Sequence, residues 1–339
     1  DLRAIDDICA RCSARRCQLR AQLRQDRGAR TSSDEGPPVT ISRFRSLASA
    51  AAAVALAVGV TVGAGGTGGQ DAAQATAAAT TPTRYLALGD SLAAGYQPGR
   101  GDAKTGGYVG SVDRYLTWKL GRNVATTNLA CSGESSTTML LAGKCSYREG
   151  SQMRAAEAFL RQHRGEVALV TLTLGANDIQ RCARGGAIDL PCLTDGAGKL
   201  FRNLPEIYGR LRAAAGPDTR IIITDYYNPF LASWLSGQSG KDAAKQSALA
   251  NVALKEYIGA TARAANAQRA RVADALRDDD TTLVSDPTYG EVPRNVQMIC
   301  TNTWMCTDTK DIHANDKGYR LMANAVIAQW RTGLTTTNP

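Results

Sequence analysis

Two kinds of segment alternate between residues 84 and 331, and this alternation narrows the folds open to the chain. Short apolar runs predict five strands, at residues 84–90, 123–130, 166–175, 220–227 and 271–276. Longer amphipathic runs predict helices at residues 107–120, 152–164, 197–215, 240–268 and 316–331. The middle strands are apolar without interruption, whereas a strand in a sheet with one face in water alternates apolar and polar residues. The alternation therefore predicts one α/β domain, a parallel sheet with helices on both faces.

The first quarter of the chain has a different composition. Residues 47–64 are almost wholly small and apolar, Arg43 and Arg45 precede them, and a small-residue triplet from Ala73 to Ala75 follows. This order of regions is typical of a secretory signal peptide. A transmembrane anchor is the alternative, because the run reaches about the minimum length that crosses a bilayer. We favour the signal peptide, since the run is rich in Ala and Gly and a cleavage site follows it.

These observations divide the chain into five parts. We expect an upstream extension outside the working protein, a signal peptide, a flexible linker, the α/β domain and a tail, at residues 1–38, 39–75, 76–83, 84–331 and 332–339. Residues 76–339 carry 30 Lys and Arg against 24 Asp and Glu, a net charge of +6, with no clustered basic stripe of the kind that nucleic-acid-binding proteins show, so we expect no nucleic acid partner. The modest basic excess is compatible with transient contact with lipid surfaces.

Six cysteines lie within the α/β domain. An even number behind a signal peptide argues for disulfide bonds, although six cysteines formally allow fifteen connectivities. Their spacing favours three local bridges, Cys131 with Cys145, Cys182 with Cys192, and Cys300 with Cys306. Three earlier cysteines, at residues 9, 12 and 17, have no fourth ligand nearby, so we expect no metal site.

Polar residues follow the predicted strands, at the edge where parallel α/β sheets bind ligands. Ser91 stands at the turn into a helix, where its hydroxyl and its unpaired N–H are both available, and helix capping is its alternative role. Gly133 follows the second strand and lets a backbone N–H approach a substrate oxygen. Asn177 follows the third strand and can donate to the same oxygen. His313 precedes the last helix, from which it can reach Ser91 as a general base.

The chain resembles the SGNH hydrolases, also called GDSL esterases and lipases, over essentially all of residues 84–331. Four blocks occur in the family's order: GDSL at 89–92, the glycine at 133, G-x-N-D at 175–178 and the histidine at 313. The resemblance extends to the secreted actinobacterial members of this family. It implies a flavodoxin-like three-layer α/β/α sandwich with a five-stranded parallel sheet, and no cofactor. It also implies that Ser91 is the nucleophile, that His313 moves the proton, and that Ser91, Gly133 and Asn177 form an oxyanion hole.

The chain departs from the family's pattern ahead of the histidine. The last block is usually D-x-x-H, but Lys310 occupies the position of the acid and Ala314 that of the usual proline. Three groups are candidates for orienting the imidazole: Asp311, Asp308, or a backbone carbonyl near Thr309 or Lys310. We favour the carbonyl, then Asp311 and then Asp308, because a carbonyl can fix the tautomer without a charge.

The resemblance implies a secreted serine ester hydrolase, an esterase or lipase that acts as a monomer, with acyl lipids as the expected substrates. A carbohydrate O-acetyl esterase and a catalytically silent cell-surface binding module are the alternatives. His163 is expected to be structural, and the acidic run 278–280 to be a solvated turn rather than a calcium site. An apolar cluster after the fourth strand either lines an acyl-binding cleft or packs its own loop: Tyr226, Tyr227, Pro229, Phe230 and Trp234.

Overall fold

The computed structural model of the chain describes residues 82–184 and 187–332. All of these residues belong to the unit Gln74–Pro339. The predicted upstream extension and signal peptide, with most of the linker and tail, lie outside the described residues. Those assignments therefore stay predictions.

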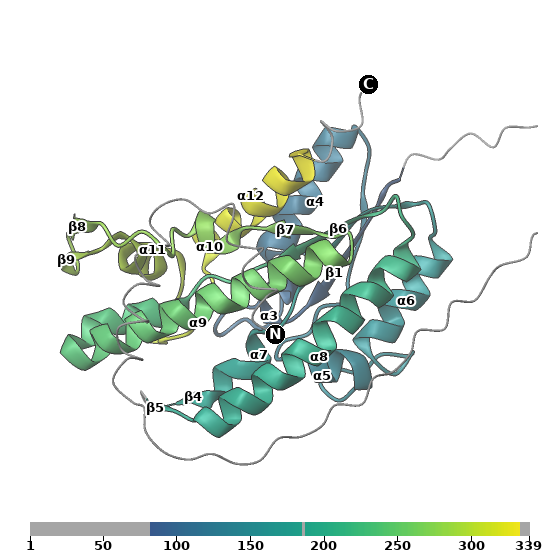
Figure 1. Cartoon of the computed structure of the whole chain (residues 1–339). Helices are drawn as coiled ribbons and strands as arrows, with labels where there is room; N and C mark the ends of the chain where they lie inside the picture. Colours follow the sequence, from purple (N-terminus) through teal and green to yellow (C-terminus); the bar gives the residue numbers. More distant parts are fainter. Residues whose placement is uncertain (1–81, 185–186, 333–339) are drawn as a thin grey trace, which may run out of the picture. The chain divides into compact units, whose positions relative to one another are not determined.

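A five-stranded parallel sheet forms the centre of the fold (Figure 1). Its strands β1, β2, β3, β6 and β7 span Arg84–Gly89, Ala125–Asn128, Val167–Thr173, Arg220–Thr224 and Gln268–Ala270. They lie in the order β2-β1-β3-β6-β7, and each neighbouring pair is parallel. When only these five strands are numbered, the order is 2-1-3-4-5, that of flavodoxin-like folds. The expected fold class is confirmed.

Helices cover both faces of the sheet (Figure 1). On one face, α4 packs against α12, at Gly107–Leu120 and Asp316–Thr332. The other layer contains α5, α6, α8 and α9, at Ser136–Leu141, Gln152–Gln162, Leu190–Ala215 and Gly237–Ala264. Short helical turns directly follow three strands: α3, α7 and α10, at Ser91–Ala94, Ala176–Ile179 and Val272–Ala275.

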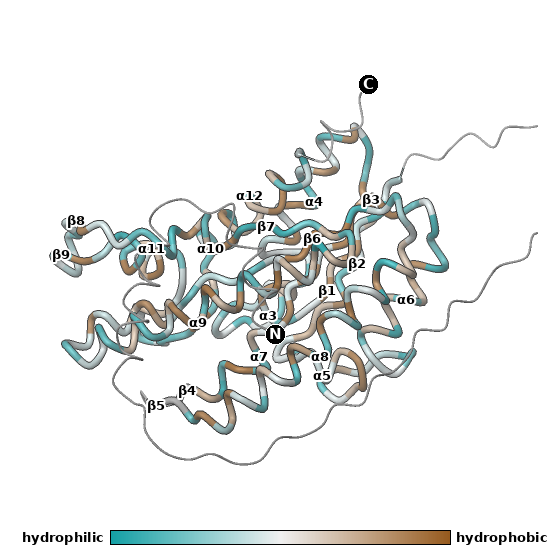
Figure 2. The backbone as a smooth tube through the Cα atoms, in the orientation of Figure 1, coloured by the Kyte–Doolittle hydropathy of each residue, from teal (hydrophilic) through white to brown (hydrophobic). Residues whose placement is uncertain are grey.

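The central strands are buried because helices cover both of their faces. Strands β1, β3 and β6 are buried along nearly their whole length, and hydrophobic segments gather there in Figure 2. Hydroxyl groups between the strands and α4 satisfy each other: Tyr85 pairs with Thr171 at 2.8 Å, and Tyr108 with Thr173 at 2.9 Å. These hydrogen bonds therefore compensate the cost of removing the hydroxyl groups from water.

The last predicted strand, at residues 271–276, is wrong. Strand β7 ends at Ala270, and the residues that follow form α10. The buried Asp225 carboxylate accepts hydrogen bonds from the N–H groups of Val272 and Ala273, at 2.6 and 3.1 Å. These bonds satisfy the free donors of a helix start, which a short apolar run does not reveal from its sequence.

The connections contain further elements that the apolar pattern does not predict. They are η1, β4, β5, η2, β8, β9 and α11, at Gln180–Cys182, Ala183–Arg184, Ala187–Ile188, Pro229–Ser236, Leu283–Asp286, Gly290–Pro293 and Arg294–Asn302.

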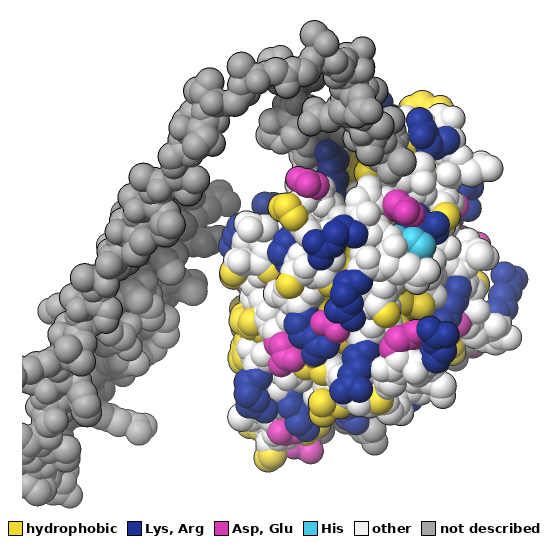
Figure 3. Space-filling model, turned by 90° about the vertical axis from the view of Figure 1, so that its right-hand side faces the viewer, with side chains coloured by type: hydrophobic (Ala, Val, Ile, Leu, Met, Phe, Trp, Pro, Cys, Tyr) yellow, Lys and Arg dark blue, Asp and Glu magenta, His cyan; other side chains and the backbone are white. Residues whose placement is uncertain are grey.

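On the face drawn in Figure 3, basic and acidic side chains are intermixed. Within residues 82–184 and 187–332, no helix has the length and apolar character needed to cross a membrane.

Candidate active site

The predicted reactive residues meet at the carboxyl edge of the sheet. Ser91 begins α3 after β1, Asn177 lies in α7 after β3, and His313 lies just before α12. All three line one cavity of about 400 Å³. Parallel strands end at the same edge, which is why residues from distant parts of the chain come together here.

Ser91 and His313 are hydrogen-bonded, with 2.7 Å between Ser91 Oγ and His313 Nε2. Ser91 is the first residue of α3, so its backbone N–H has no acceptor within the helix. Asp90 caps this helix instead, by accepting a hydrogen bond from the Leu92 N–H at 3.0 Å. The neighbouring residue therefore fills the capping role, and the Ser91 hydroxyl faces the imidazole.

Asp311 continues this hydrogen-bonded chain. Its Oδ1 lies 2.6 Å from His313 Nδ1 and also accepts the backbone N–H of His313 at 2.8 Å. The two side chains are 23% and 15% exposed, so the pair is largely shielded from water. With Nδ1–H donating to Asp311, Nε2 is the nitrogen that accepts the Ser91 proton.

The carbonyl partner that the sequence favours is wrong, because a carboxylate holds the imidazole nitrogen. Lys310 adopts a left-handed backbone, with φ of 46°, and the Asp311 N–H then donates to the Trp304 carbonyl. This turn brings an acid only two positions before the histidine into reach, through an Asx turn onto the His313 N–H. Asp308 and Lys310 are exposed.

Contacts on both sides of His313 hold its loop in place. The ring of Tyr96 lies 4.4 Å from the imidazole, measured between centroids. Tyr227 donates from its hydroxyl to the Ile312 carbonyl at 2.8 Å. The side-chain amide of Gln97 donates to the Ala314 carbonyl at 3.3 Å.

Asn177 is oriented by two hydrogen bonds. Its Nδ2 donates to the Glu134 carbonyl at 2.9 Å, and its Oδ1 accepts from Gln180 Nε2 at 2.5 Å. One N–H of the amide therefore remains for a ligand. Gly133 lies outside the cavity lining and is linked to Asn177 through the next residue, Glu134. Its φ of 80° lies in the left-handed region, which favours glycine.

Asp90 is a buried carboxyl next to Ser91. Its Oδ2 accepts a hydrogen bond from the Tyr226 hydroxyl at 2.6 Å. Burial raises the pKa of Asp90 to about 7, although the bond from Tyr226 opposes that shift. Its contacts with Leu92 and Tyr226 show that Asp90 anchors the turn that carries Ser91.

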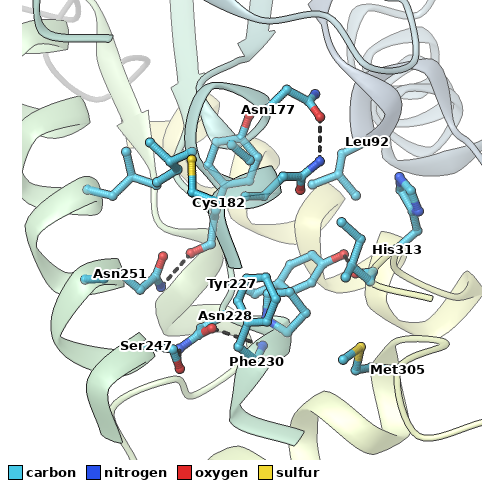
Figure 4. Close-up of a pocket in the computed structure, with 18 of the residues that line it drawn as sticks. Leu92, Asn177, Cys182, Tyr227, Asn228, Phe230, Ser247, Asn251, Met305 and His313 are labelled. Carbon is cyan, nitrogen blue, oxygen red and sulfur yellow. Dashed lines mark hydrogen bonds between the residues drawn. The ribbon is translucent and has the colours of Figure 1, made fainter. Parts of the chain in front are cut away.

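The cavity extends from Ser91 and His313 along η2 and α9. In Figure 4, His313 lies on one side of the view, and Cys182 and Asn251 on the other. Four members of the apolar cluster after β6 line this space: Tyr226, Tyr227, Pro229 and Phe230. Trp234 is not among the lining residues, and Lys241 lies over its ring at 5.2 Å. Most of the cluster therefore lines the cavity, and Trp234 lies outside it.

Three disulfide bonds staple loops around the site, with the predicted pairing. Cys131–Cys145 closes the loop that contains Gly133, and Cys182–Cys192 ties η1 to α8. Cys300–Cys306 ties α11 to the segment before His313. Cys182 also contributes to the cavity wall.

Two weaker sequence features have other roles. His163 caps the C-terminus of α6, and its Nδ1 lies 3.3 Å from Glu166, which fits the expected structural role. The expected solvated turn at 278–280 is wrong for Asp278, which is buried and accepts the Asn228 N–H at 2.7 Å. The described part of the chain contains no cluster of three or more His, Cys, Asp or Glu suited to a metal ion.

Sequence reasoning missed Gln180 and Tyr96. Gln180 follows Asn177 by three positions, so the i, i+3 spacing of a helical turn is a signal that could have found it. Tyr96 is far from His313 in the sequence, and only the three-dimensional fold brings the two rings together.

A sequence model of the GDSL-like lipase/acylhydrolase family matches residues 87–321, a range that contains Ser91, Gly133, Asn177 and His313. The chain belongs to this family. Membership makes it a carboxylic ester hydrolase. A comparison with curated proteins gave no match.

Several solved structures are similar to this member of the GDSL-like family. A lipase from a goat rumen metagenome has 16% identity over 73% of this chain and 96% of its own, with a TM-score of 0.45. An acetylxylan esterase from Geobacillus stearothermophilus has 15% identity over 73% and 94%, with a TM-score of 0.46. Phospholipase A1 from Streptomyces albidoflavus NA297 has 16% identity over 73% and 99%, with a TM-score of 0.43. At these values the likeness does not select a substrate.

Proposed function

We propose that this GDSL-like hydrolase cleaves acyl esters, with lipids as its main substrates, through an acyl-enzyme on Ser91. The observation that carries the proposal is the hydrogen-bonded chain from Ser91 through His313 to Asp311, which ends in an apolar cavity. Nucleophile, base and orienting acid stand within hydrogen-bonding distance of each other, as this chemistry requires.

In the first half-reaction, Ser91 Oγ attacks the ester carbonyl while His313 Nε2 takes the hydroxyl proton. Asp311 holds the imidazole in the required tautomer and stabilises its charged form. The oxyanion that develops is bound by the N–H groups of Ser91 and Gly133 and by the Asn177 amide. His313 gives this proton to the leaving oxygen as the ester C–O bond breaks, and the alcohol departs. A water activated by the same nitrogen then hydrolyses the acyl-enzyme.

The cavity wall supports an acyl chain as the group bound there. Two of its asparagines are engaged within the protein: Asn228 Nδ2 donates to Ser247 Oγ at 2.9 Å, and Asn251 Nδ2 donates to the backbone carbonyl of Tyr226 at 3.1 Å. Apolar groups form much of the remaining wall, including Leu92, Ile179, Phe230, Leu254, Met305 and Ile312. Its volume of about 400 Å³ lies within the usual range for a small-molecule site.

We also propose that the enzyme is secreted as a monomer and makes transient contact with lipid surfaces. The disulfide bonds and the apolar segment at 47–64 support secretion. Exposed apolar side chains near the cavity-lining elements η2, α8 and α9 support contact with lipid: Leu190, Leu235, Leu249 and Val252. Sequencing the N-terminus of the secreted product tests the cleavage after Ala75.

Hydrolysis of p-nitrophenyl esters from acetate to palmitate tests the proposed reaction. We expect kcat/KM to rise from acetate toward medium and long chains, and Ser91→Ala and His313→Ala to lose at least about 1000-fold of it. A maximum at acetate would favour a carbohydrate O-acetyl esterase. No turnover by folded wild type on any ester would favour a silent binding module and overturn the proposal.

A further inference from the structure

A single buried side chain, that of Gln152, connects the turn before Ser91 to the loop of Gly133. Gln152 is the first residue of α6 and is fully buried. Its Oε1 accepts the Gly89 N–H at 2.6 Å, and its Nε2 donates to the Gly89 carbonyl at 3.0 Å. The amide therefore pairs with both polar groups of the residue that precedes Asp90 and Ser91.

The same Nε2 donates to Glu134 Oε2 at 2.9 Å. Glu134 follows Gly133, and its own carbonyl holds the amide of Asn177 at 2.9 Å. Its side chain is buried with Oε1 unpaired, and burial raises its pKa. Thr138, Tyr147 and the charge of Lys144 also act on this carboxyl, but Gln152 is the donor that binds Gly89 at the same time.

The three groups of the proposed oxyanion hole come from three different turns, after β1, β2 and β3. The contacts of Gln152 and Glu134 join all of them: Gly89 leads to Ser91, Glu134 follows Gly133, and the Glu134 carbonyl orients Asn177. Rate acceleration by such donors depends on their mutual placement to within a fraction of an ångström.

We propose that Gln152 and Glu134 are positioning residues, which set the spacing of the oxyanion donors without touching the substrate. This inference rests on the proposed acyl-enzyme function. Loss of the Gln152 amide would leave the bond from the Cys131 N–H to the Gly89 carbonyl, at 2.9 Å, as the remaining link between the two loops, and the oxyanion donors would then be held less tightly. Stabilisation of the oxyanion would then fall, while the acyl-binding cavity would keep its shape.

The test compares Gln152→Met, which keeps the length of the side chain, with Ser151→Ala as a matched control. Ser151 is the buried N-cap of the same helix and accepts from the Arg154 N–H at 3.3 Å. Loss of this cap should lower the melting temperature by roughly 2–4 °C. We expect Gln152→Met to lower kcat by about 10- to 100-fold with KM within about 2-fold of wild type. Ser151→Ala should keep kcat.

A second readout uses an alkyl boronic acid, whose tetrahedral adduct mimics the oxyanion. Its inhibition constant should rise in parallel with the loss of kcat in Gln152→Met and stay unchanged in Ser151→Ala. Equal kcat and equal inhibition constants in the two variants would overturn the proposal. Two other results would contradict the proposed function itself: wild type does not hydrolyse esters, or Ser91→Ala still does.

Glu134 variants carry the test if Gln152→Met does not fold. Glu134→Gln keeps an acceptor for Gln152 Nε2, so kcat should stay within about 3-fold of wild type. Glu134→Leu removes the acceptor and should repeat the loss of about 10- to 100-fold in kcat at unchanged KM. Equal kcat in Glu134→Gln and Glu134→Leu would show that the hydrogen bond between Gln152 and Glu134 does not position the oxyanion donors, and would overturn the proposal.

Discussion

At the residue scale, Asp311 shows how an acid two positions before a histidine can hold its ring. The backbone and ring N–H groups of His313 both bind the same carboxylate oxygen. The left-handed Lys310 makes this turn accessible. The four family blocks identified Ser91, Gly133, Asn177 and His313 from the sequence, but the partner of His313 depends on backbone conformation at one position, which residue types alone do not determine.

Asp311→Asn should therefore lower kcat/KM by about 100- to 10,000-fold, because an amide no longer enforces the productive tautomer of His313. Asp308→Ala is the matched control, since Asp308 is an exposed acid of the same loop. It should stay within about 2-fold of wild type. Steady-state hydrolysis of one p-nitrophenyl ester measures both variants. An equal loss in Asp308→Ala would contradict the assignment of Asp311.

At the element scale, the long helix α9 forms one wall of the cavity. Ala243 and Leu254 line the cavity from this helix, whereas Ala253 is exposed and is not among the lining residues. The predicted helix at 240–268 locates α9 within a few residues. The wall that it forms was not predictable, because a long helix with small residues on several faces does not show in its sequence which face meets a ligand.

Ala243→Phe should shorten the space for an acyl chain. Each methylene that loses its site forfeits about 0.8 kcal/mol, so loss of two or three should lower kcat/KM on palmitate by about 10- to 100-fold. Activity on acetate should stay within about 3-fold. Ala253→Phe is the control and should leave the chain-length profile unchanged. Equal losses on acetate and palmitate in Ala243→Phe would show that the cavity does not bind the acyl chain.

At the scale of the whole molecule, buried carboxyls link stability to pH. Burial raises the pKa of Asp225 from 3.8 to about 6, although the N–H groups of Ala273 and Val272 and the Arg269 charge oppose the shift. The folded state therefore holds this proton to a higher pH than the unfolded state does. The stabilising contribution is full below about pH 4 and is lost as the pH rises through about 6.

Asp225→Asn should lose this pH dependence. Relative to wild type, its free energy of unfolding should rise by about 1 to 3 kcal/mol between pH 4 and pH 7.5, because the amide has no proton to lose. Urea unfolding at both pH values measures the difference. Asp218→Asn, which changes an exposed carboxyl, should show a constant difference from wild type. If the difference in free energy of unfolding between Asp225→Asn and wild type is also the same at both pH values, the proton on Asp225 does not link stability to pH.

The parallel sheet with helices on both faces follows from the alternation of apolar and amphipathic segments, and the flavodoxin-like arrangement follows from the resemblance to the family. The displaced strand before α10 was not predictable, since an apolar run of a few residues suits either structure until Asp225 supplies the helix cap. The contacts of Gln152 were equally hidden, because this residue of α6 binds Gly89 and Glu134 in two separate turns.

Covalent labelling of Ser91 is a direct test of its role as the nucleophile. A p-nitrophenyl alkylphosphonate transfers its phosphonyl group to a nucleophilic serine and releases p-nitrophenol. The tryptic peptide of residues 85–100 contains Ser91 as its single serine, so mass spectrometry can locate the adduct. We predict one phosphonyl group per chain on this peptide, with a rate that collapses in His313→Ala and no label on this peptide in Ser91→Ala. An active enzyme that stays unlabelled at Ser91, or carries the group on another residue, would contradict the account.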